Sequence, residues 1–191
     1  MNALQYLREN PSSRYWDIID AMRPYGVEAP IDEDGEIDDE SYLTLITMAA
    51  DDLMEAMEGD YLRVYRAMTV PPDWEPDDIG VHWARRRGMA YAYNAAKKDG
   101  YVEIILEGLV HIDHVNLNHS IVLNMDLSEE EVLLISDAEI EITAASLRDG
   151  TPTHQHIVGR SFHALYARSK AGLRLYDWST EVRLHVSVGL R

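Results

Sequence analysis

The spacing of apolar residues changes at residue 61, and this change limits the fold more than any other feature of the sequence. Before it, apolar residues recur every three or four positions over 4–8, 15–22 and 43–57, which predicts helices. We expect Ser41 to cap the third of these. From 61 to 70 the apolar residues alternate with a second set, and Val70-Pro71-Pro72 ends the run, which predicts a strand.

The rest of the chain contains many short strand patterns. We predict a helix over 85–94 and strands over 101–110, 120–125, 131–135, 138–143 and 183–188. Short strands after a helical beginning predict an α+β fold built on an antiparallel sheet. The absence of βαβ alternation and of a glycine-rich loop disfavours a Rossmann or P-loop nucleotide site.

Acidic residues are concentrated in the first part of the sequence. The chain has 34 acidic and 17 basic residues, for a net charge of −17, and residues 1–80 hold 20 of the acids but 5 of the bases. We divide the chain into an acidic helical N-terminal segment, 1–60, and a main domain, 61–191. Because such a charge repels phosphate backbones and anionic lipids, we expect a basic protein as partner, with no direct binding to nucleic acid or membrane.

Several common site types are disfavoured. The lack of cysteine excludes disulfides, a thiol nucleophile and thiolate zinc sites, and the sequence has no signal-peptide pattern and no apolar run of about 20 residues, so we expect a cytoplasmic location. Residues 32–40 resemble a calcium loop, but Pro30 and Ser41 stand where carboxylate ligands are required. The histidines lack metal-ligand spacing, so we predict no metal, and we expect residues 85–87 to form a solvated basic helix face rather than a phosphate site.

Three segments carry residues suited to chemistry. They are Tyr65-Arg66 within a strand, Val81-His82-Trp83-Ala84 after Gly80, and Glu129-Glu130-Glu131 before Val132-Leu133-Leu134. An arginine within a strand needs an anionic partner if its face is buried, and an aromatic ring beside a small residue can stack a flat ligand. Glu129 and Glu131 are two positions apart, so an extended chain turns both to one face, where a cation or developing positive charge would stabilise them.

In this order the segments resemble the arginine-class mono-ADP-ribosyltransferases, which include clostridial-type toxins and transferases encoded by bacteriophages. That family has an arginine on its first strand, Ser-Thr-Ser on a later strand, and Glu-x-Glu before an apolar strand. The resemblance covers residues 61–143, with His82-Trp83-Ala84 in place of Ser-Thr-Ser. A second register, Glu139-Ile140-Glu141, lacks the following apolar strand, so Glu131 is preferred.

The resemblance implies both a fold and an activity. The fold is an ADP-ribosyltransferase-like antiparallel split β-sheet or sandwich core with N-terminal helices. The activity is transfer of ADP-ribose from NAD to a protein acceptor, with arginine as the expected acceptor, through an oxocarbenium-like transition state that a nearby carboxylate stabilises. A bacteriophage origin would put the protein in the host cytoplasm or in the virion.

The resemblance also assigns roles to individual residues. Glu131 is expected to hold the ribose 2′-hydroxyl and stabilise the developing cation, and Glu129 to orient or deprotonate the acceptor. Arg66 is expected to hold the diphosphate or the adenosine ribose. The residues implied at NAD are Tyr65, Arg66, His82 and Trp83, with Trp83 near the nicotinamide.

Two alternatives remain open. The missing Ser-Thr-Ser motivates a non-catalytic protein that keeps the fold as a structural or virion interaction module. The net charge of −17 and the carboxylates at 32–40 motivate an acidic DNA mimic that inhibits a nucleic-acid-binding protein.

Overall fold

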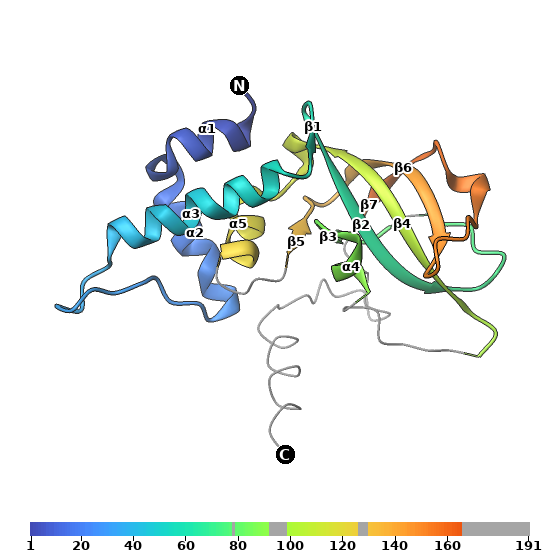
Figure 1. Ribbon diagram of the computed structural model, residues 1–191, viewed down its shortest axis with the longest axis horizontal. Coiled ribbons are helices and arrows are strands. Elements are labelled where there is room, and N and C mark those ends of the chain that lie inside the picture. The colour runs from blue at the N-terminus through green and yellow to red at the C-terminus, as the bar shows by residue number, and fades with distance from the viewer. Residues whose placement is uncertain (78, 92–98, 126–129, 166–191) are drawn as a thin grey trace, which may run out of the picture.

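The computed structural model describes residues 1–77, 79–91, 99–125 and 130–165. Helices gather on one side of the molecule and a curled antiparallel sheet forms the other (Figure 1). The prediction of an α+β fold is confirmed. Glu129 and the strand predicted over 183–188 lie outside the described residues.

The N-terminal helices follow the sequence pattern closely. They are α1 (Ala3–Glu9), α2 (Tyr15–Met22) and α3 (Asp39–Met54), with two short 3-10 helices, η1 (Pro11–Arg14) and η2 (Arg23–Tyr25). The prediction that Ser41 caps α3 is wrong, because the Asp38 carboxylate accepts the Ser41 backbone N–H at 3.1 Å. The helix therefore begins at Asp39, and Asp39 and Glu40 in its first turn interact favourably with the helix dipole.

The strand predicted over 120–125 is a helix. Helix α5 (Leu117–Met125) packs against α2, α3 and strand β5 (Glu131–Leu133), and Ser120, Ile121, Val122, Leu123 and Asn124 are all buried. A helix covered on several sides shows no alternation of apolar and polar residues, and a short apolar run does not distinguish it from a buried strand. Helix α5 lies beside the outer edge of β5 and contacts it directly.

Within the described residues the strands form one seven-stranded antiparallel sheet in the order β5-β3-β2-β4-β6-β7, with β1 paired to β2. Strands predicted over 61–70, 101–110, 131–135 and 138–143 are present with ends shifted by a few residues. The strands are β1 (Met57–Glu58), β2 (Tyr61–Val70), β3 (His82–Ala84), β4 (Val102–His111), β5 (Glu131–Leu133), β6 (Ala138–Leu147) and β7 (Ser161–Ala164). The remaining short helices are α4 (Arg87–Ala90), η3 (Ile112–His114) and η4 (Gln155–Ile157).

The sheet curls until its far edge meets the segment that leads into β3. Ile79 forms a parallel bridge with Ala164 of β7. The Ile79 N–H donates to the His163 carbonyl at 3.0 Å, and the Leu165 N–H donates to the Ile79 carbonyl at 2.8 Å. This contact fixes the start of β3, where several predicted site residues lie.

One hydrophobic core joins the helices to the sheet. Its buried residues include Leu4, Tyr42 and Leu53 from the helices and Leu62 and Leu106 from the strands. Helix α5 contacts α2 and α3 on one side and β5 on the other. The first residue of β5, Glu131, therefore lies where the helices meet the sheet.

Candidate active site

The sheet brings residues from all three predicted site segments onto neighbouring strands. Tyr65 of β2 pairs with Ala84 of β3, and Ala84 pairs with Glu131 of β5. Side chains of residues paired directly across a sheet point to the same face. Tyr65 and Glu131 therefore share one face, although they are distant in the sequence.

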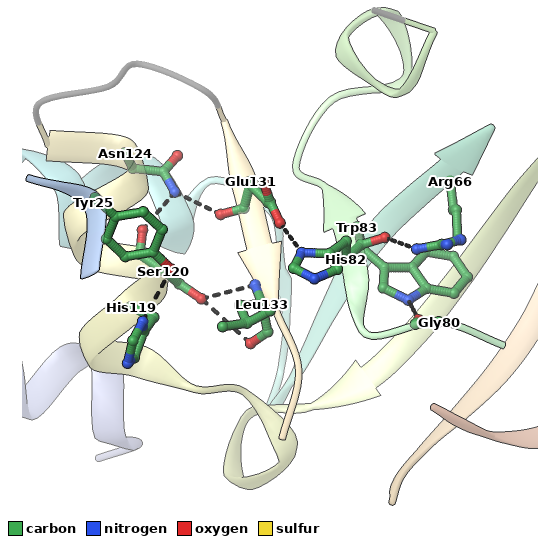
Figure 2. A network of polar contacts seen from close by, with 10 residues as sticks. All are labelled: Tyr25, Arg66, Gly80, His82, Trp83, His119, Ser120, Asn124, Glu131 and Leu133. Carbon is green, nitrogen blue, oxygen red and sulfur yellow. Dashed lines mark hydrogen bonds and ion pairs between the residues drawn. The ribbon is translucent and has the colours of Figure 1, made fainter. Parts of the chain in front are cut away.

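Glu131 contacts His82 on that face. The His82 Nδ1 lies within hydrogen-bonding distance of a carboxylate oxygen of Glu131, and Figure 2 shows the two side chains pointing toward one another. The Glu131 side chain is 11% exposed and that of His82 is 32% exposed. Because an ionised carboxylate only accepts hydrogen bonds, the Nδ1–H of His82 is the donor. The pair holds a nearly buried carboxylate in a fixed direction beside a partly exposed ring.

Arg66 supports His82 from the other face of the sheet. It follows Tyr65 in β2, so its side chain points away from the face of Glu131. Its Nη1 donates to the carbonyl oxygen of His82. The guanidinium lies over Gly80, where a Cβ would come within 2.6 Å of Nη2. Arg66 thus holds the backbone of His82, and the expected contact with the diphosphate of NAD stays a prediction.

Trp83 is a core residue. Its side chain is on the opposite face from His82, it is 2% exposed, and its Nε1 donates to the Gly80 carbonyl at 2.8 Å. This hydrogen bond and the guanidinium of Arg66 both fix the turn that enters β3 (Figure 2). A contact between Trp83 and nicotinamide stays a prediction.

Two side chains of α5 form hydrogen bonds with the backbone of β5 at its outer edge, which the sequence did not indicate. The Ser120 hydroxyl accepts the Leu133 N–H at 3.0 Å, and the Asn124 amide donates to the Glu131 carbonyl at 2.8 Å. These polar groups satisfy the outer edge of β5, where no further strand pairs in the described part of the sheet. The strand predicted over 120–125 does not indicate these contacts, although a serine and an asparagine four positions apart in an apolar run fit one helix face.

Tyr65 is a neutral donor at physiological pH. Burial, together with the nearby charge of Glu107, raises the pKa of its phenol, and the charges of Arg63 and Arg87 oppose this effect only in part. Glu107 itself forms an ion pair with Arg63. Tyr65 therefore offers a protonated hydroxyl on the same face as Glu131.

The prediction of a solvated basic face over residues 85–87 is wrong for Arg85. Its side chain is 4% exposed and is surrounded by Asp52, Glu55 and Glu130. The sequence pattern missed this because two of these carboxylates belong to α3 and come close only in the folded chain. The side chain of Arg86 is 57% exposed, as predicted.

Within the described residues, the structure contains neither a cluster of metal-binding side chains nor a membrane-spanning helix. Across residues 1–77, 79–91, 99–125 and 130–165, no group of three or more histidine or carboxylate side chains is arranged to hold a metal ion. In the same residues, no helix is long and apolar enough to cross a membrane. Glu129 lies outside these residues, so the site contains one described carboxylate of the predicted pair.

No family model matches the chain, and neither a curated protein nor a solved structure matches it. A functional proposal therefore depends on the residues and their geometry.

Proposed function

We propose that the protein is a mono-ADP-ribosyltransferase that uses NAD as substrate and modifies a protein acceptor, with arginine as the acceptor side chain. One observation carries the proposal. The segments that resemble the three family motifs lie on adjacent strands β2, β3 and β5, with Glu131 as the first residue of β5. One side chain from each segment, those of Tyr65, His82 and Glu131, lies on the same face of these strands, as a shared chemical role requires.

Glu131 is the proposed catalytic carboxylate. Cleavage of the bond between ribose and nicotinamide develops positive charge on the ribose, so a fixed carboxylate stabilises the transition state more than the ground state. The shielding of Glu131 strengthens this effect, because charges interact more strongly away from water. His82 orients the carboxylate by donating a hydrogen bond from Nδ1.

The residues around Glu131 fit a nucleotide sugar. His82 and Tyr65 are partly exposed rings on the same face as the carboxylate, and both can donate hydrogen bonds. NAD, when bound, supplies the activated bond to nicotinamide. In this proposal Tyr65 and His82 contact the ribose side of the ligand, and Arg66 acts through the backbone of His82.

The proposal includes the predicted fold, an ADP-ribosyltransferase-like split sheet. Strands β2 and β3 share one residue pair, Tyr65 with Ala84. The curl of the sheet and this short pairing support an ADP-ribosyltransferase-like split sheet. The acidic residues of 1–80 would attract a basic target protein through long-range steering.

The proposal is tested by transfer of label from tagged NAD into proteins of a bacterial lysate. We expect labelled bands with the natural protein and none with Glu131→Gln, which keeps the shape of the side chain but loses its charge. The matched control is Glu141→Gln, an exposed glutamate of β6 that belongs to the second register. Unchanged labelling by Glu131→Gln, or loss of labelling by Glu141→Gln instead, would contradict the assignment.

Absence of labelling by the natural protein, with its fold intact, would favour the non-catalytic module.

For Glu129, the proposal predicts that Glu129→Ala loses transfer to protein but keeps some NAD hydrolysis, because water replaces the acceptor. Equal loss of both would contradict the separate roles of the two carboxylates.

A further inference from the structure

Arg85 is a buried cation that the proposed function does not use. Its side chain is 4% exposed, whereas that of Arg86 is 57% exposed. Burial of a charged group is costly unless opposite charges and hydrogen bonds surround it. Its position therefore depends on its partners.

Three carboxylates surround the guanidinium. Glu55 lies 3.2 Å from Nη1, and Asp52 and Glu130 lie 3.7 and 3.6 Å from Nη2. Asp52 belongs to the last turn of α3, which contains no basic residue, and Glu55 is the C-terminal cap of this helix. Because the C-terminal end of a helix carries partial negative charge, it favours a cation there. Arg85 thus connects α3 to the residue just before Glu131.

Glu130 has an unusual backbone conformation. Its φ is 52°, in the left-handed region that residues other than glycine seldom adopt. Arg85 contacts Glu130 in two ways. The Arg85 backbone N–H donates to the Glu130 carbonyl at 2.7 Å, and the Arg85 guanidinium pairs with the Glu130 carboxylate. Because Glu131 directly follows Glu130, the backbone conformation of Glu130 sets the orientation of Glu131.

We propose that Arg85 is a positioning residue, which fixes the backbone of Glu130 and thereby holds the Glu131 carboxylate against His82. Asp52 and Glu55 of α3 complete the arrangement by holding the guanidinium from the helical side. The catalytic consequence rests on the proposed function, whereas the effect on the contact between Glu131 and His82 does not depend on NAD.

Two variants and one control test this role. Arg85→Lys keeps the charge but loses the planar group that reaches three carboxylates. Glu130→Gly keeps the left-handed conformation accessible but removes the carboxylate that Arg85 holds and frees the backbone. Arg86→Gln is the control, since Arg86 also pairs with Glu130 and Glu55 but is exposed.

The direct measurement is the protonation state of the His82 ring nitrogens, read from long-range proton–nitrogen NMR spectra. In the natural protein we expect the proton on the Nδ1 that faces Glu131, because an ionised carboxylate only accepts hydrogen bonds. We expect Arg85→Lys and Glu130→Gly to lose this single tautomer while staying folded, and Arg86→Gln to keep it. In parallel, we expect kcat for nicotinamide release to fall by about 10- to 100-fold in the two variants, with a much smaller change in KM for NAD.

A purely structural role would lower the melting temperature without changing the His82 signals. Natural His82 signals in folded Arg85→Lys and folded Glu130→Gly would overturn the inference, and if Arg85→Lys does not fold, Glu130→Gly alone decides. If the natural protein releases no nicotinamide, the proposed function fails, and the NMR comparison still decides whether Arg85 positions Glu131.

Discussion

The amide nitrogen of Asn124 donates hydrogen bonds to two backbone carbonyls, that of Ser120 in its own helix at 2.7 Å and that of Glu131 in β5 at 2.8 Å. Both partners are acceptors, which fixes the orientation of the amide. This side chain is thus a buried link between α5 and the strand that carries the proposed catalytic carboxylate.

Replacement of Asn124 is therefore expected to destabilise the protein. Asn124→Ala removes the donor from two buried carbonyls and should lower the free energy of unfolding by about 1–3 kcal/mol. Asn124→Asp should cost more, because it puts a charged acceptor against the two carbonyl oxygens. Urea unfolding measures both, and an equal or smaller loss for Asn124→Asp would contradict the hydrogen-bond assignment.

Gly80 is expected to be required for the position of Arg66. A Cβ at this residue would lie 2.6 Å from Nη2 and 2.9 Å from Cζ of Arg66, so Gly80→Ala should displace the guanidinium from the His82 carbonyl. Because the end of an arginine side chain can move, we expect a loss of stability of about 1 kcal/mol and a larger relative loss of NAD turnover.

The control for this prediction is Gly88→Ala, since a Cβ at Gly88 meets nothing within 4 Å. It should leave turnover unchanged and stabilise α4 by about 0.5–1 kcal/mol. A double-mutant cycle with Arg66→Ala measures the coupling, and strictly additive effects of Gly80→Ala and Arg66→Ala would show that the two residues act separately.

His119 should make the stability depend on pH. Burial lowers the pKa of its imidazole below the usual 6.5, and its Nδ1 contacts the Tyr25 hydroxyl at 3.0 Å. The unfolded chain then binds a proton more readily than the folded protein. The His119 contribution is fully present above about pH 6.5 and is lost as the pH falls below it, by at most about 1.4 kcal/mol per pH unit.

The measurement is urea unfolding of the natural protein and His119→Gln between about pH 7.5 and 5. The difference in unfolding free energy between the two proteins should change in favour of the variant as the pH falls. Carboxylates that titrate in this range affect both proteins alike, so a constant difference would show that His119 does not titrate differently on folding.

The sequence predicted the helices and strands whose apolar residues recur with a clear period. The prediction failed where an element is buried on several sides, because its apolar residues then show no period. Strand β2 runs over Tyr61–Val70 and helix α2 over Tyr15–Met22, as predicted, because each has one apolar face. Helix α5 was predicted as a strand because it is covered by two helices and β5. Strands β1 and β7, with two and four residues, were not predicted because such short segments have no readable period.

The sequence indicates the segments of the candidate site but not how they meet. The segments around Tyr65, His82 and Glu131 stand out in the sequence because of their residue types and their order. The contact between His82 and Glu131 depends on the pairing of β3 with β5, which joins residues far apart in the chain. The burial of Arg85 depends on α3, and no local pattern reports such an arrangement.

Glu131 is proposed to stabilise the transition state in which the bond between nicotinamide and ribose of NAD breaks, and release of nicotinamide by the purified protein tests this role most directly. We expect the natural protein to release nicotinamide and Glu131→Gln to do so at least about 100-fold more slowly, with both proteins folded. Release at equal rates, or none from the folded natural protein, would contradict the account.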